Sequence, residues 1–197
     1  MRVSIFNYGV GNLYSVQTAL KREGAIPQIT SDIRKAKVAD ALLLPGVGSF
    51  SEAASRLPRD EIRDLASAGK PILGVCLGLQ LFFESSDEGP GRGLGLVSGQ
   101  VRRLPSTVKV PQIGWNVLKV RNRSALVEGV PDESWVYYVH SYYPDTQDDC
   151  IVATTEYGLE YPCLIAKNNV FGTQFHPEKS GTSGRIILQN FLRLVRR

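Results

Sequence analysis

Cys76 is the residue in this sequence best placed to do chemistry. The apolar run at residues 71–75 leads into it, glycines flank it at positions 74 and 78, and a helix-compatible segment follows at residues 77–83. This pattern has the form of a nucleophile elbow with cysteine in place of serine, in which the nucleophile occupies a strained turn between a strand and a helix. The start of that helix would favour the thiolate, and the backbone N–H of Leu77 would face a developing oxyanion. A buried, inert cysteine at a strand end is the alternative, and the pentapeptide alone leaves both interpretations open.

His176 is the candidate general base. In Phe175-His176-Pro177-Glu178, a carboxylate follows the histidine by two residues, so Glu178 can turn back and accept a hydrogen bond from one ring nitrogen. The other nitrogen is then free to take the thiol proton, which is the logic of a catalytic triad. Pro177 favours an extended backbone at His176. A polar strand end is the alternative interpretation of this histidine.

The second histidine, His140, lies in an expected strand at residues 135–140. Strand alternation places Val136, Tyr138 and His140 on one face. Because His140 has no nearby carboxylate in the sequence, we favour His176 as the base and expect a structural or interface role for His140.

The loop at residues 45–48 is the candidate for the second half of an oxyanion site. It follows a buried strand, so it is expected at the same carboxyl edge of the sheet as Cys76. Its two glycines allow backbone N–H groups, those of Val47 and Gly48, to approach a substrate carbonyl. A tight turn is the commoner fate of such a loop, and only its position relative to Cys76 favours the functional interpretation.

The elements that would position these residues alternate between strand and helix in the first half of the chain. Strands are expected at residues 2–6, 26–30, 39–44 and 71–75, and helices at residues 13–23, 33–37, 51–56 and 60–68. The second half predicts short strands at residues 100–104, 116–120, 135–140, 151–157, 164–167 and 170–175, and a final amphipathic helix at residues 185–195. This order predicts an α/β fold: a doubly wound, mostly parallel sheet with helices on both faces and an antiparallel extension. No linker or repeat interrupts it, so we expect one domain over residues 1–197.

Composition argues against several other classes of protein. Three widely spaced cysteines, Cys76, Cys150 and Cys163, give no disulfide framework and suit a reducing cytosol. There is no CxxC pair or histidine cluster, so we expect neither a metal nor another cofactor. The net charge of +4 is small, and the lysines and arginines are mostly scattered along the chain, which does not favour nucleic-acid binding. We expect no signal peptide and no membrane span, and therefore a cytoplasmic protein.

The cysteine and histidine motifs together resemble those of the class I (triad) glutamine amidotransferases. The matching segments are Gly74-Val75-Cys76-Leu77-Gly78-Leu79-Gln80 and Phe175-His176-Pro177-Glu178. Members of this family hydrolyse glutamine to glutamate and deliver ammonia to a partner synthase. The resemblance implies a thioester on Cys76, with His176 as general base and acid and Glu178 orienting His176.

Further motifs resemble one branch of that family, the glutaminase subunits of imidazole glycerol phosphate synthases. They are spread over residues 7–13, 45–50, 113–116, 137–142 and 172–180, which is nearly the whole chain. The resemblance implies a heterodimer with a (βα)8-barrel cyclase that receives ammonia through an internal channel. The cyclase would combine ammonia with a phosphoribosyl-formimino nucleotide, giving imidazole glycerol phosphate for histidine biosynthesis and a carboxamide nucleotide.

The same resemblance implies further residue roles. The implied glutamine-binding positions are Gly46, Gly48, Gln80, Glu88, Ser141 and Tyr142, and the implied partner-interface positions are Asn12, Trp115 and Lys179. Gln80 also has independent support, because it lies one helical turn after Cys76. Glu88 could instead be a solvated loop acid, and Trp115 a core aromatic residue.

Three other functions compete with this one. A glutaminase serving a different synthase would share the triad and is disfavoured by the resemblance alone. A cysteine peptidase or chaperone-like hydrolase would not require Gln80, Glu88 or a carboxylate directly after His-Pro. A non-catalytic subunit would have no need for Cys76, His176 and Glu178 together.

Overall fold

The first half of the chain alternates between strands and helices, as predicted. The structure, a computed structural model, describes residues 1–9 and 11–196; Val10 of the first motif and Arg197 lie outside the described residues. The strands are β1 (Arg2–Phe6), β2 (Ile26–Thr30), β3 (Ala41–Leu44) and β4 (Ile72–Val75). The helices are α1 (Leu13–Arg22), α2 (Ile33–Val38), α3 (Phe50–Arg56), α4 (Arg59–Ser67) and α5 (Leu77–Gln80).

The second half is mostly strand. Its strands are β5 (Gln100–Arg103), β6 (Gln112–Val120), β7 (Ser134–His140), β8 (Tyr142–Asp145), β9 (Ile151–Glu156), β10 (Glu160–Lys167) and β11 (Val170–Thr173). Two 3₁₀ helices, η1 (Ala125–Val127) and η2 (Pro177–Lys179), and the long helix α6 (Gly181–Val195) complete it.

Strand order brings the two halves together in one sheet. Among the described residues, nine strands pair in the order β2-β1-β3-β4-β11-β10-β9-β6-β7, and β5 pairs with β8 in a separate ribbon. The strands from β2 to β11 are parallel, and those from β10 to β7 form the predicted antiparallel extension. Because β11 returns beside β4, with Thr173 opposite Val75, the segment after β11 lies next to Cys76.

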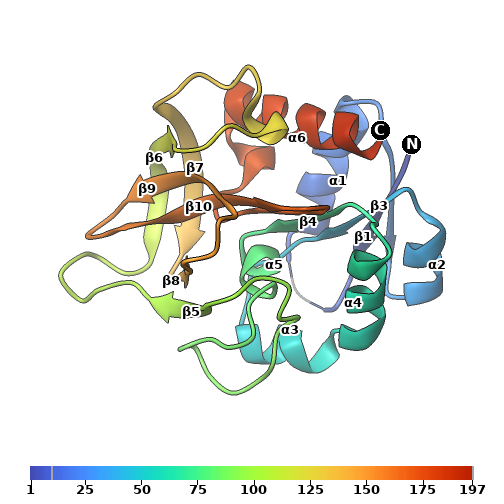
Figure 1. Cartoon of the computed structure of the whole chain (residues 1–197), viewed down its shortest axis with the longest axis horizontal. Helices are drawn as coiled ribbons and strands as arrows, with labels where there is room; N and C mark the ends of the chain where they lie inside the picture. Colours follow the sequence, from blue (N-terminus) through green and yellow to red (C-terminus); the bar gives the residue numbers. More distant parts are fainter. Residues whose placement is uncertain (10, 197) are drawn as a thin grey trace.

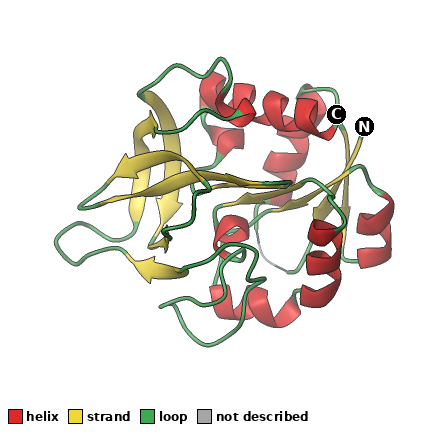
Figure 2. Cartoon of the chain, in the orientation of Figure 1, coloured by secondary structure: helices red, strands yellow, loops and turns green. Residues whose placement is uncertain are grey.

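Helices cover both faces of the parallel part of the sheet (Figures 1 and 2). One core cluster joins the sheet to α1 and α6, and the other joins it to α2, α3, α4 and α5. In β3, Leu43 belongs to the first cluster, whereas Leu42 and Leu44 belong to the second. The uninterrupted apolar run of this strand therefore has the predicted cause, which is coverage on both faces.

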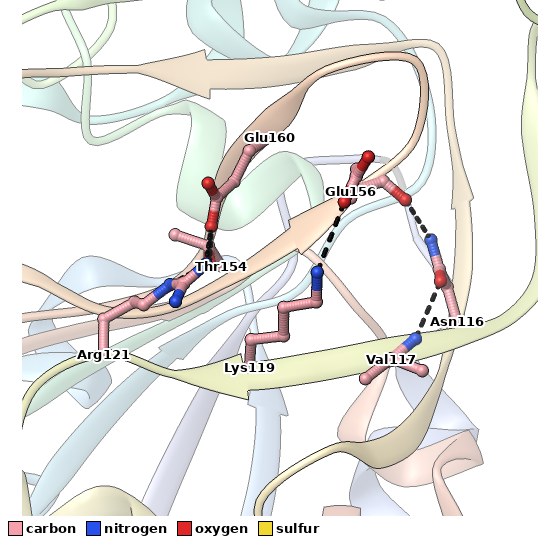
Figure 3. A network of polar contacts seen from close by, with 7 residues as sticks. All are labelled: Asn116, Val117, Lys119, Arg121, Thr154, Glu156 and Glu160. Atoms are coloured by element: carbon pink, nitrogen blue, oxygen red, sulfur yellow. Dashed lines mark hydrogen bonds and ion pairs between the residues drawn. The ribbon is translucent and has the colours of Figure 1, made fainter.

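Side chains reinforce the contact between β6 and β9 within the antiparallel extension (Figure 3). The ladder between β6 and β9 is short, pairing Lys119 with Thr154 and Val120 with Ala153. Asn116 Nδ2 donates to the Glu156 carbonyl at 2.9 Å, and Arg121 Nε donates to Thr154 Oγ1 at 2.9 Å (Figure 3). These contacts hold β6, and with it β7, against the rest of the sheet.

Several predicted strand boundaries are wrong, mostly where a glycine or proline within the strand disfavours the prediction of a strand. β6 begins at Gln112 rather than at residue 116, β10 begins at Glu160 rather than at residue 164, and β8 was not expected. Gly114 interrupts the apolar pattern of β6, Pro162 lies at a bulge in β10, and Pro144 lies in β8. Pairing with neighbouring strands outweighs these local signals.

Two helix boundaries differ because of tertiary contacts. The helix expected over residues 77–83 ends at Gln80. Beyond it, the backbone N–H groups of Leu94 and Leu96 donate hydrogen bonds to the carbonyls of Leu81 and Phe82. The last helix begins at Gly181 instead of residue 185, where its first turns pack against η2. Within the described ranges, no helix combines the length and apolar character needed to cross a membrane.

Gly78 supplies a test of how closely α5 is packed on the sheet. A Cβ on Gly78 would lie 1.9 Å from the Leu44 carbonyl oxygen, which is backbone and has little freedom to shift. We expect Gly78→Ala to lower the free energy of unfolding by about 2 kcal/mol or more, measured by denaturant unfolding.

Gly129→Ala is the matched control. Its Cβ meets no atom within 4 Å, and only its φ of 76° opposes the substitution, which costs about 1 kcal/mol. Equal stability of the two variants would contradict the close packing of α5.

Candidate active site

Cys76 occupies a strained turn between β4 and α5. Its φ is 54° and its ψ is −108°, a conformation that non-glycine residues rarely adopt. Its backbone N–H donates to the Thr173 carbonyl at 2.7 Å, which fixes the turn to the end of β11. A Cβ on Gly74 would lie 2.5 Å from the Gly78 carbonyl oxygen, so the turn closes only with glycine there. The elbow conformation predicted from the sequence is confirmed.

His176 and Glu178 form a buried pair. His176 Nδ1 lies 2.9 Å from Glu178 Oε1, with side-chain exposures of 4% and 1%. β11 ends at Thr173, not at residue 175 as predicted, and His176 has the expected extended backbone before η2. Its N–H donates to the Tyr137 carbonyl at 2.9 Å, and Ser180 Oγ donates to its carbonyl at 2.6 Å. A backbone contact from β7 and the side chain of Ser180, just after η2, therefore hold the backbone that carries this imidazole.

The other ring nitrogen of His176 is available for proton transfer. Within the described residues, Nε2 is buried and has no hydrogen-bond partner. Burial favours the neutral ring, but the interactions of the ring with Cys76 and Glu178 outweigh it and raise the pKa of His176 from 6.5 to about 10. The raised pKa makes the His176 ring a strong acceptor for the proton of the Cys76 thiol, and the imidazolium that forms would stabilise the thiolate.

The loop after β3 lies across the start of α5. The Tyr8 hydroxyl donates to the Pro45 carbonyl, and burial raises the pKa of Tyr8, so this phenol stays a donor. A Cβ on Gly46 would lie 2.5 Å from Leu77 Cβ. The Leu77 N–H, the expected oxyanion donor, points to the Gly46 carbonyl oxygen at 3.4 Å. In this conformation the loop carbonyl occupies the direction that an oxyanion would need.

A pocket of about 240 Å³ opens beside Cys76. It is lined by Val47, Gly48, Cys76, Leu77, Gln80, Glu88, Pro111, Val139, His140, Ser141 and Tyr142. The structure thus brings eight of the sequence-predicted site residues to one cavity. Gly46 is not among them, because it is packed beneath Leu77, and the pair of His176 and Glu178 is buried behind the cysteine.

Two polar residues of the pocket are held by specific hydrogen bonds. Gln80 Nε2 donates to the Tyr142 carbonyl at 2.9 Å and to Gln174 Oε1 at 3.1 Å, which leaves its Oε1 to face a ligand. Glu88 Oε2 accepts from the Phe50 N–H at 2.6 Å, at the start of α3. Glu88 is therefore not a freely solvated loop acid.

Sequence reasoning gave no site role to four residues that the structure places here. Pro111, Val139 and His140 line the pocket, and Gln174 Nε2 lies 3.5 Å from Cys76 Sγ. The one available signal for Gln174 was its place just before His176. His140 is held by the Tyr142 carbonyl at 2.8 Å and by the Tyr161 hydroxyl at 2.9 Å, which agrees with the structural role expected for it.

The three residues implied as interface positions lie at the surface near this site. Trp115 is 52% exposed, so it is not a core residue, and its ring packs edge-on against Tyr137. Lys179 Nζ lies 5.5 Å from the Tyr137 ring centroid. Asn12 is exposed and caps α1, which packs against η2. No cluster of metal-ligating side chains occurs in the described part of the chain.

Comparison with known proteins identifies relatives over the full length. The family model for glutamine amidotransferase class-I matches residues 5–195. The chain is 48% identical to "Imidazole glycerol phosphate synthase subunit HisH" of Methanosarcina mazei, covering 98% of both chains. It is 46% identical to the protein of the same description from Archaeoglobus fulgidus, covering 99% of this chain and 100% of that one.

Solved structures share the fold at low sequence identity. The structure of PurLQS from Thermotoga maritima matches with a TM-score of 0.79 and 22% identity, covering 98% of both chains. A crystal structure described as a glutamine amidotransferase matches with a TM-score of 0.78 and 21% identity, covering 99% of both chains. The predicted α/β fold is confirmed.

His140 should make the protein sensitive to acid. Burial lowers its pKa from 6.5 to about 4, with a smaller contribution from the nearby His176. The unfolded chain therefore binds more protons between these values, so stability is complete above pH 6.5 and is lost as the pH falls toward 4. We expect wild type to lose about 3 kcal/mol more than His140→Gln between pH 7 and pH 4, measured by denaturant unfolding. Parallel pH profiles of the two proteins would contradict a neutral, buried His140.

Proposed function

We propose, from the premise that the chain belongs to the class I glutamine amidotransferase family, that it is the glutaminase subunit of an imidazole glycerol phosphate synthase. It hydrolyses glutamine and supplies ammonia for histidine biosynthesis. One observation carries this proposal: a cysteine in a strained turn lines a pocket and interacts with a buried His176–Glu178 pair.

The chemistry follows from these three side chains. The Cys76 thiol proton passes to His176 Nε2, and the sulfur attacks the side-chain carboxamide carbon of glutamine. His176 returns the proton to the leaving nitrogen, the C–N bond breaks, and ammonia leaves a γ-glutamyl thioester on Cys76. Water, deprotonated by His176, then cleaves the thioester to glutamate and regenerates the thiol. Glu178 holds the ring through Nδ1 during both steps.

The oxyanion site needs a movement of the loop. We assign its donors to the backbone N–H groups of Leu77, Val47 and Gly48. The Gly46 carbonyl now accepts from Leu77, so that carbonyl must turn away before the tetrahedral intermediate can use this N–H. Exposed Gly48, at φ 137°, gives the loop the freedom to move. We therefore expect low activity in the isolated chain.

The pocket provides groups for the amino-acid end of glutamine. The Glu88 carboxylate suits the α-ammonium group, and Gln80 Oε1 can accept a hydrogen bond from the substrate. Ser141 and Tyr142 line the same cavity, as does Gly48, whereas Gly46 would contribute from beneath through its backbone.

We assign the partner surface to the exposed side of β6 and β7. Ile113, Trp115 and Trp135 are each more than half exposed there, and Tyr137 lies between Trp115 and Lys179. Large aromatic residues gathered on an exposed face indicate a protein interface. Val139, the next outward residue of β7, lines the pocket, so the face borders the site where ammonia is released.

We propose the remaining features from the resemblance. The partner is a (βα)8-barrel cyclase in a heterodimer, with Asn12, Trp115 and Lys179 of this chain at the interface. Ammonia passes through a channel to the acceptor nucleotide. The chain acts as one domain in the cytoplasm and needs no cofactor of its own.

Cys76→Ala should abolish glutamine hydrolysis while leaving the fold intact, because no thioester can form. The measurement is glutamate production by the chain with its cyclase and acceptor nucleotide, with circular dichroism to check folding. Cys150→Ala is the control, since Cys150 is buried away from the pocket and should retain activity. Wild-type turnover by Cys76→Ala would refute the mechanism.

Trp115→Ala should weaken partner binding by about 30-fold, the usual loss for a central aromatic residue at an interface. The measurement is the cyclase concentration that gives half-maximal stimulation of glutaminase activity. Ile26→Ala is the control, because Ile26 is also more than half exposed but lies on β2, at the opposite edge of the sheet. An unchanged requirement for cyclase, or no stimulation of wild type, would contradict this assignment.

A further inference from the structure

Gln174 is fully buried beside the nucleophile. Register brings it there, because Thr173 pairs with Val75 and the next residues of the two parallel strands are Gln174 and Cys76. Gln174 Nε2 lies 3.5 Å from Cys76 Sγ, within range of an N–H···S hydrogen bond. The triad chemistry described above makes no use of this amide.

The orientation of this amide is determined by its neighbours. The Tyr142 carbonyl can only accept, so the Gln80 atom 2.9 Å from it must be nitrogen. That same nitrogen lies 3.1 Å from the Gln174 side chain, so the atom it meets must be the Gln174 oxygen. The nitrogen of Gln174 is therefore the atom that faces the sulfur, and it presents a donor to Cys76.

A hydrogen-bond donor stabilises the Cys76 sulfur more strongly in its thiolate form than in its thiol form. The thiol has an acceptor of its own, the Val139 carbonyl at 3.8 Å, which becomes unfavourable once the proton has left. A donor hydrogen bond strengthens when its acceptor becomes charged. The helix after Cys76 is a single turn, residues Leu77–Gln80, so its dipole supplies little of this stabilisation.

We propose that Gln174 is a positioning residue that, oriented by Gln80, holds the Cys76 sulfur through an N–H···S hydrogen bond and favours the thiolate. This inference rests on the proposed function, and it adds to Gln80 a second task besides facing the substrate.

Two variants distinguish the effect of the Gln174 N–H donor from the effect of side-chain packing at this position. Gln174→Glu keeps the side-chain length and the acceptor for Gln80 but places an oxygen where the donor was. Gln174→Met keeps an unbranched side chain without either polar group. Gln189→Met is the control for the chemical change, because Gln189 is partly buried, donates to Glu23 and does not line the active-site pocket.

The primary measurement is the rate of Cys76 alkylation by iodoacetamide as a function of pH, followed at that residue by peptide mass spectrometry. We expect the midpoint of the alkylation profile to rise by about one pH unit in Gln174→Met and further in Gln174→Glu, where a like charge is added. In the cyclase complex, we expect kcat for glutamine to fall about tenfold in Gln174→Glu, with KM within about threefold of wild type. Gln189→Met should match wild type in both assays.

An unshifted alkylation profile in folded Gln174→Glu would overturn the proposal. A fall in kcat that accompanies the unshifted profile would indicate a structural role only. If Gln174→Met does not fold, Gln174→Glu alone decides. Alkylation needs no glutamine, so a shift measured in a chain whose wild type lacks glutaminase activity would refute the proposed function and leave the hydrogen bond standing.

Discussion

The active site depends on one constraint, the direct contact between the turn at Cys76 and the ends of two buried strands. Gly78 touches the Leu44 carbonyl, and Gly74 touches the Gly78 carbonyl, so no side chain fits at either position. The backbone at Cys76 is forced into a conformation that costs about 1–3 kcal/mol, and the surrounding sheet provides the stability that maintains it. In return, the sulfur projects from the carboxyl edge of the sheet into the pocket.

The pairing of β4 with β11 places the rest of the chemistry around that sulfur. It joins segments about a hundred residues apart, and it holds Thr173 against the Cys76 amide. Beyond Thr173 the chain leaves the β4 ladder, and His176 is instead anchored to β7 through Tyr137 and Ser180. Gln174 directly follows the strand pair that carries the nucleophile, and its N–H donates to the Cys163 carbonyl of β10, whereas the base is anchored to β7 of the antiparallel extension. The distance between Cys76 and His176 thus depends on the position of β7 relative to β4 and β11.

Strand β7 therefore contacts the active site and also carries part of the exposed aromatic face. Its inward residues, Val136, Tyr138 and His140, are buried, while Trp135 is exposed. Val139 and Tyr137 lie on the outward side, and their carbonyls meet the Cys76 sulfur and the His176 amide respectively. A protein docked on the exposed aromatic face would therefore press on the strand that supports both reacting side chains.

Local sequence patterns are sufficient to predict the catalytic side chains, whereas the residues that surround them depend on the pairing of distant strands. The elbow at Cys76 and the pairing of His176 with Glu178 could be predicted, because glycine spacing and a two-residue separation fix geometry over a few bonds. The first two strands were predicted to the residue, because turn residues bound them closely, Asn7 after β1 and Gly24 and Ser31 on either side of β2. The neighbour of Cys76 at Gln174, the engagement of Leu77 by Gly46, and the hydrogen bonds of His140 were not predicted. Each depends on which strands pair and in which register, and that choice is made by the packing of the whole sheet rather than by any local segment.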